Sequence, residues 1–190
     1  MNSVIYNRKR VLLTGNCEYE LLGLTSLLTS MDYEVQRPKM PDAGTYDLVL
    51  VALSAELLAG WGRHIQGIRM LHAGNPVPMV VLVPSKLQGM RLLKGTAQVI
   101  NGRYSLTQLR TMLRLAFEKQ SRTEQSGKLT RHQKKALMSL RLIISSNASR
   151  KASSHKDYYL RACLVEHVGM DSLHVLCVSG LLSEMAGWPE

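Results

Sequence analysis

The chain has 190 residues, 45% of them hydrophobic, and Lys and Arg outnumber Asp and Glu by 24 to 14, which gives a formal net charge of +10. This length allows one large domain or two small ones. The positive charge favours an anionic partner, nucleic acid before a membrane surface. The three cysteines (Cys17, Cys163 and Cys177) contain no CxxC pair, so neither a disulfide framework nor a zinc site is predicted.

The chain shows no signal for export or for a membrane span. The opening MNSVIYNRKR has no apolar run behind its charges, as a signal peptide would. No apolar stretch approaches the ~18 residues that a transmembrane helix needs. We therefore expect a cytoplasmic protein without a membrane partner.

Residues 8–120 alternate short apolar runs with helical patterns. Continuous apolar runs such as DLVLVAL and VPMVVLV are typical of strands that are buried on both faces. The alternation predicts an α/β unit with a five-stranded parallel sheet and helices on both faces. Strands are predicted at 10–13, 33–35, 47–53, 77–83 and 98–100, and helices at 18–31, 57–71, 86–95 and 106–119, the last capped by Ser105.

The opening segment VLLTGNCEYELLGL resembles the receiver domain of two-component response regulators, with Gly23 and Leu24 preserved. The resemblance covers about residues 8–119 and implies a flavodoxin-like, receiver-like domain at 1–119. Residues 118–128, EKQSRTEQSGK, are polar without apolar periodicity, so residues 120–128 are predicted to be a linker.

The chemistry that a receiver domain needs is missing from the matching positions. Phosphotransfer there uses an aspartate nucleophile, an acidic pair that holds Mg²⁺, a hydroxyl group and a lysine. By the resemblance, the acidic pair falls on Gly15 and Asn16, the nucleophile on Ala52, the hydroxyl on Val83 and the lysine on Asn101. Magnesium prefers hard oxygen ligands, and Ala52 cannot accept a phosphoryl group. We therefore predict a receiver-like domain without phosphorylation, metal or cofactor.

Residues 129–190 read as a small all-α domain. Helices are predicted over 131–144, from Ser153 or Ser154 to His167 before Gly169, and from Asp171 or Ser172 to residue 185. Residues 128–161 contain nine Lys or Arg and one acid, whereas residues 162–190 contain four acids and no Lys or Arg. A helical unit with one apolar and one cationic face suits a phosphate backbone. The alternative is an ordinary solvated basic face.

The Leu-Thr at 129–130 and the later EHVGMDSLHVL resemble the LuxR/NarL-type helix-turn-helix of bacterial transcription regulators. That family closes its recognition helix with Lys-Leu-Gly-Val-x-Ser-x-x-x-Leu. Gly169, Ser172 and Leu176 stand at the matching positions, and His167 replaces the Lys. Together with the receiver-like domain, this resembles the non-phosphorylated auxiliary regulators of enteric bacteria that act on fimbrial, capsule or motility genes, of the fimbrial regulator W type.

The resemblance implies a DNA-binding transcription regulator whose recognition helix lies in residues 153–167. Basic side chains there would contact phosphates, and polar side chains would read base edges. By this resemblance Lys151, Lys156 and Arg161 face DNA, His155 and Tyr158 reach base edges, and Arg150, Lys128 and Arg131 touch phosphates.

Two other interpretations remain open. The departures from the helix-turn-helix pattern permit an interaction protein that modulates a partner response regulator by heterodimerisation without reading DNA. The segment DYYLRACLVEHVGM also resembles the second unit of AraC-like proteins. An enzyme is not expected, because the six histidines show no ligand spacing and no GxGxxG, Walker or GxSxG motif is present.

The last predicted helix is more apolar than a domain of this size needs for itself. Its apolar positions are Leu173, Val175, Leu176, Leu181 and Leu182. We therefore expect it to form a dimer contact, either with a second copy or with a partner regulator.

Overall fold

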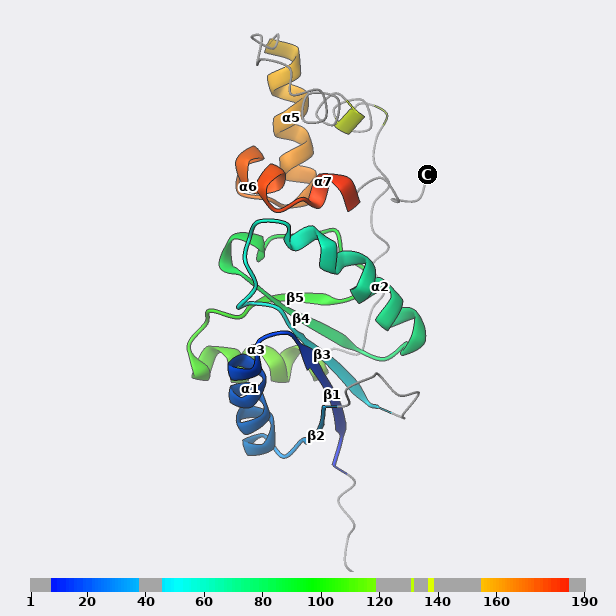
Figure 1. Ribbon diagram of the computed structural model, residues 1–190, viewed down its shortest axis with the longest axis vertical. Coiled ribbons are helices and arrows are strands. Elements are labelled where there is room, and N and C mark those ends of the chain that lie inside the picture. Colours follow the sequence, from blue (N-terminus) through cyan, green and yellow to red (C-terminus); the bar gives the residue numbers. More distant parts are fainter. Residues whose placement is uncertain (1–7, 38–45, 119–130, 132–136, 139–154, 185–190) are drawn as a thin grey trace, which may run out of the picture.

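The structure, a computed structural model, describes residues 8–37, 46–118, 131, 137–138 and 155–184. The described residues form one parallel sheet with the strand order β2-β1-β3-β4-β5 (Figure 1). This is the flavodoxin-like order of doubly wound α/β folds, and it confirms the fold predicted for the N-terminal unit. The strands are β1 (Arg10–Gly15), β2 (Glu34–Gln36), β3 (Leu48–Ala52), β4 (Met79–Val83) and β5 (Gln98–Asn101).

The two central apolar runs behave as their sequences predict. Every residue of β3, LVLVA, and of β4, MVVLV, is buried. Helices α1 (Glu18–Ser30) and α3 (Leu106–Glu118) pack on one face of the sheet, and α2 (His64–Gly74) packs on the other (Figure 1). The predicted cap of α3 is present, since the main-chain N–H of Gln108 donates to Ser105 Oγ at 3.4 Å.

The helix predicted over 57–71 was wrong at its start. A short 3-10 turn, η1 (Trp61–Arg63), precedes α2, and Gly60 before it has a left-handed φ of 71°. The N–H groups of Gly60 and Gly62 donate to the carbonyls of Val178 and Ser179 at 3.0 and 2.7 Å. Hydrogen bonds to the C-terminal helices therefore replace the helical bonds that the local pattern favours.

The helix predicted over 86–95 was also wrong. Only η2 (Ser85–Leu87) is helical there, and turns follow it. Met90, Leu92 and Leu93 are all buried, which a short one-faced helix would not achieve. The N–H of Arg91 donates to the carbonyl of Val168 at 2.8 Å, so this segment too is shaped by the C-terminal helices.

Three C-terminal helices are described: α5 (His155–Val168), α6 (Leu173–Val178) and α7 (Leu181–Glu184). The end of α5 at Gly169 and the N-cap at Ser172, whose Oγ accepts the N–H of Val175 at 3.3 Å, are confirmed. The single helix predicted beyond it was wrong, because Gly180, with a φ of 71°, separates α6 from α7. The predicted linker and most of the predicted helix at 131–144 lie outside the described residues.

One apolar cluster joins the C-terminal helices to the N-terminal unit. Its fully buried members include Trp61 and Leu93 on one side and Val168, Leu176 and Leu181 on the other. In Figure 1, α6 and α7 lie over the side of the sheet that carries α2. The two predicted domains thus share a core, although the division at residues 120–128 itself stays a prediction.

The shared cluster contradicts the argument that the apolar last segment needs a dimer partner. Val175, Leu176, Leu181 and Leu182 are 0–7% exposed, and the same chain covers them. The surplus of apolar residues in the last segment is explained by packing on the N-terminal unit. A dimer stays a prediction without support from these side chains.

Within the described ranges, no helix has the length and apolar character needed to cross a membrane.

Candidate functional site

The positions implied for phosphotransfer gather at the carboxyl edge of the sheet. Gly15 and Ala52 end β1 and β3 and are register partners, and Val83 and Asn101 are partners at the ends of β4 and β5. Asn16 follows β1 directly. This is the edge at which open α/β sheets bind ligands. None of the five side chains is a carboxylate, a hydroxyl or an amine.

A carboxylate that sequence reasoning did not single out closes this edge. Glu20, in the first turn of α1, accepts hydrogen bonds from Ser54 Oγ at 2.5 Å and from the N–H groups of Ser54 and Ala55, both at 3.2 Å. The loop after β3 is therefore tied to α1. Glu20 precedes Leu21 directly and lies four residues before Leu24, so it borders the apolar stripe of α1. This position is the sequence signal that could have predicted an inward-facing Glu20.

The edge leaves no room for a side chain at the first position of the missing acidic pair. A Cβ built at Gly15 would collide with the main-chain carbonyl of Ala52. Any side chain at position 15 therefore requires β1 and β3 to move apart. Asn101, at the position implied for the lysine, instead donates to Gln88 Oε1 at 3.2 Å and accepts the N–H of Arg103 at 2.9 Å. Its role is structural.

A second polar group lies next to this edge. The Glu56 carboxylate accepts from Asn16 at 3.1 Å and Arg63 at 3.2 Å, and its Oε2 lies 3.4 Å from His64 Nε2. Burial raises the pKa of Glu56, but the hydrogen bonds from Asn16 and Arg63 and the nearby positive charges outweigh it, so the net pKa is lowered. Burial lowers the pKa of His64 despite the opposing charge of Glu56. Among described residues, no group of three or more potential metal ligands is present.

Incubation with acetyl phosphate and Mg²⁺ is expected to leave no acid-labile phosphoryl group on the protein. The physical reason is that Ala52 offers no nucleophile and that Gly15 and Asn16 offer no carboxylate for the metal. Intact mass measured before and after acid treatment checks this, with an active receiver domain as positive control. Stoichiometric phosphorylation of any aspartate contradicts it.

The residues implied for DNA contact can be placed only in part. His155 and Tyr158 lie on one exposed face of α5 with Tyr159, and Tyr158 is 66% exposed. Arg161 lies one turn after Tyr158, is half-buried, and has a buried Nε without a hydrogen-bond partner. Arg131 is helical and exposed but does not belong to α5, whereas Lys156 lies on α5. Lys128, Arg150 and Lys151 fall outside the described residues, as does the side chain of Lys156.

Tyr159 is an exposed residue of this face that sequence reasoning missed. It is 65% exposed and lies four residues before Cys163. A hydrogen bond with Cys163 raises the pKa of the Tyr159 hydroxyl. The sequence signal for this residue was the pair Tyr158-Tyr159, which lies near the start of a helix and next to basic residues. Exposed tyrosines are common at interfaces.

The opposite face of α5 fixes this helix to the N-terminal unit. Leu164 and Val168 are fully buried in the shared cluster, and the Val168 carbonyl accepts the N–H of Arg91. Backbones also meet closely here, since a Cβ at Gly169 would collide with the carbonyl of Gly89. The exposed face of α5 is therefore held in one orientation relative to the sheet.

Comparisons with known proteins give only remote matches. No protein-family model matches the chain, and no curated protein gives a significant match. The receiver domain of sensor histidine kinase PA1611 from Pseudomonas aeruginosa PAO1, with magnesium in its active-site cleft, is 21% identical over 59% of this chain and 99% of that chain, with a TM-score of 0.43. A chain that carries the trimeric coiled coil of yeast Spc42 fused to another protein is 14% identical over 74% of this chain and 95% of that chain, with a TM-score of 0.46. The fold assignment rests on the strand order instead.

Proposed function

We propose that this protein is a DNA-binding transcription regulator that acts without phosphorelay chemistry and is not an enzyme. The observation that carries the proposal is the combination of a flavodoxin-like sheet without phosphotransfer groups and a C-terminal helix, α5, fixed to it with an exposed face. His155, Tyr158 and Tyr159 lie on that face, inside the basic block at 128–161. The resemblance to enterobacterial auxiliary regulators extends the proposal to genes of surface structures such as fimbriae.

The docking of α5 supports regulation without a phosphorylation switch. Glu20 ties the loop after β3 to α1 at the edge where a phosphoryl group would act, and main-chain hydrogen bonds hold the C-terminal helices in place. A regulator built in this way has no need of a phosphoryl signal to orient α5. DNA binding by the unmodified chain is the expected consequence.

Replacing Lys156 and Arg161 together by Ala is expected to weaken binding to a fluorescein-labelled duplex. Each lost phosphate contact should lower the slope of log affinity against log salt by roughly one unit. Fluorescence anisotropy at several salt concentrations measures both quantities, and circular dichroism verifies that the variant is folded.

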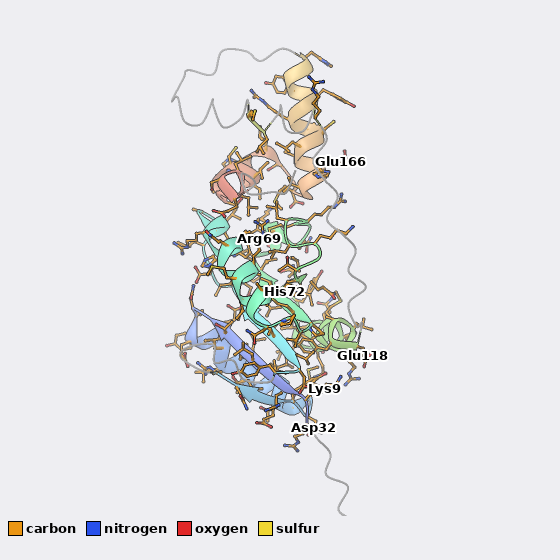
Figure 2. The ribbon with its side chains drawn as sticks, turned by 90° about the vertical axis from the view of Figure 1, so that its right-hand side faces the viewer. Lys9, Asp32, Arg69, His72, Glu118 and Glu166 are labelled. Atoms are coloured by element: carbon orange, nitrogen blue, oxygen red, sulfur yellow. The ribbon has the colours of Figure 1, made fainter. Side chains whose placement is uncertain are left out.

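The matched control removes the same charge far from α5. Lys9 and Arg114 are both exposed, and Lys9 lies at the end of the molecule opposite α5 (Figure 2). The variant Lys9→Ala with Arg114→Ala should keep the wild-type slope. If the two double variants behave alike, α5 is only a solvated basic helix and the proposal fails.

A second candidate function is heterodimerisation with a partner regulator. It is favoured by the exposed face of α1, on which apolar side chains lie beside Glu18, whose charge is paired with Arg37. Tyr19 is 86% and Leu22 is 53% exposed, and Gly23, Ser26 and Thr29 continue the same face. A partner would cover these residues. Failure of the full chain to bind any duplex at low salt would leave this candidate as the better one.

A further inference from the structure

Charge is distributed unevenly along the N-terminal unit. Residues 57–117 contain no Asp or Glu but eight Lys or Arg, whereas residues 8–56 contain seven acids and five bases. Because the sheet order places β4 and β5 at one side and β2 and β1 at the other, the acid-free half occupies one side of the sheet. The excess positive charge is therefore concentrated in space as well as in sequence.

Ion pairs show the same division. In the first half, Arg8 pairs with Asp32 at 2.8 Å and Arg37 pairs with Glu18 at 2.6 Å. In the acid-free half, Arg63 reaches back to Glu56 at 3.2 Å. Lys86 and Arg91 have no carboxylate within ion-pair distance among the described residues. Both residues are exposed.

Residues 84–97, here called the β4–β5 segment, carry Lys86, Arg91 and Lys94 and contact the C-terminal helices at Gly89 and Arg91. The N–H of Arg91 donates to the carbonyl of Val168, the last residue of α5. The charge of Arg91 also helps to lower the pKa of His167, after the larger effect of burial, so the guanidinium lies close to this helix end. The position of the segment next to α5 is therefore fixed by its own main chain.

Arg69 adds a further cation beside the segment. Its Nη2 donates to the carbonyl of Leu92 at 3.4 Å, and it projects from α2 below the C-terminal helices (Figure 2). Glu166 is the acidic residue of α5 closest in sequence to Val168, and it projects from the exposed face of that helix (Figure 2). Arg91 thus lies at the C-terminal end of α5, and Arg69 contacts the segment that carries it.

The spacing of these features suits a duplex that lies along α5. A helix of 14 residues is about 20 Å long, so this length of α5 separates His155 from the helix end that contacts Arg91. Duplex DNA carries one negative charge per about 1.7 Å of its axis, so phosphates extend along all of this length. An unpaired lysine and arginine on a fixed backbone can bind them with little loss of main-chain freedom.

We propose that the β4–β5 segment is a second phosphate-backbone contact surface, in which Lys86 and Arg91 bind phosphates of the same duplex that contacts α5. The proposal rests on the function proposed above. It makes the receiver-like unit part of the nucleic-acid interface.

Replacing Lys86 and Arg91 together by Ala is expected to lower the salt slope of duplex binding by about two units and to weaken binding at ~0.1 M salt by about tenfold or more. The control is again Lys9→Ala with Arg114→Ala, which removes the same charge. Neither Lys86 nor Arg91 contributes its side chain to the buried cluster, so both variants should keep the wild-type melting temperature. Equal slopes for the two double variants overturn the proposal.

Further outcomes separate this proposal from the one on which it rests. If Lys86→Ala with Arg91→Ala loses affinity while Lys156→Ala with Arg161→Ala does not, the segment is the contact surface and α5 is not. If the wild type binds no duplex, the proposed function fails, and elution from heparin then decides whether the segment binds polyanions. Earlier elution of the Lys86/Arg91 variant than of the control supports a polyanion surface, and identical elution excludes it.

Discussion

A fragment of residues 1–119 is expected not to fold as a cooperative unit, although these are the bounds of the predicted receiver-like domain. The sheet face that carries α2 has no regular helix between β4 and β5, only the turn η2. Trp61, Leu87 and Leu93 lie fully buried on this side, in the cluster that α5, α6 and α7 complete. Removing those helices exposes large apolar side chains, each worth about 1.5–3 kcal/mol when buried.

Thermal unfolding followed by circular dichroism tests this expectation. The full chain should unfold in one transition, and the fragment should show no cooperative transition or should aggregate. Both proteins contain all strands of the sheet, so loss of the transition would report the absence of α5, α6 and α7. A fragment that melts cooperatively near the temperature of the full chain contradicts a shared core.

Gly169→Ala is expected to be the most harmful single substitution of a glycine at the contact between the two units. Gly169 has a φ of 76°, and a Cβ there would collide with the carbonyl of Gly89. A left-handed backbone costs an alanine about 1–2 kcal/mol. Forcing two packed backbones apart is expected to cost about 1–3 kcal/mol more.

Gly60→Ala supplies the matched control for the backbone effect alone. Gly60 has a similar φ of 71°, but nothing lies within 4 Å of a Cβ built on it. Urea unfolding of both variants should therefore show a larger loss of free energy for Gly169→Ala. Equal losses would mean that the close approach of Gly89 and Gly169 contributes nothing to stability.

The parts of the fold that the sequence predicts well are those fixed by local pattern. The runs LVLVA and MVVLV are apolar at every position, so they identify strands buried on both faces before any neighbour is known. The Ser105 cap and the end of α5 at Gly169 depend on single residues with a strong local preference.

The parts that failed depend on contacts between distant segments. Residues 57–60 and 88–95 have helical patterns, but the N–H groups of Gly60 and Arg91 donate to carbonyls of the C-terminal helices. Met90, Leu92 and Leu93 are buried in the cluster that those helices share. The same contact explains the apolar surplus of α6 and α7, which predicted a dimer because no partner within the chain was visible. Glu20 was missed for a related reason, since its hydrogen bonds to Ser54 join residues far apart in sequence.

The residue types at the candidate site were predictable from the sequence, but the contacts between those residues were not. Ala52, Gly15 and Asn101 were sufficient to predict the absence of phosphotransfer, because the groups that this reaction needs are properties of residue type. Lys86 and Arg91 could not be linked to α5 without the hydrogen bond from Arg91 to Val168. A stretch without Asp or Glu shows that positive charge is present, but only the fold shows which elements this charge lies beside.

The most direct test of the proposed function is titration of a fluorescein-labelled random-sequence duplex with the purified, unphosphorylated full chain at several salt concentrations. We expect binding at low salt that weakens linearly on a plot of log affinity against log salt, with a slope of several units. Acetyl phosphate and Mg²⁺ should leave affinity and slope unchanged. No binding at low salt, or binding that appears only after treatment with acetyl phosphate, would contradict a regulator that contacts DNA without phosphorelay chemistry.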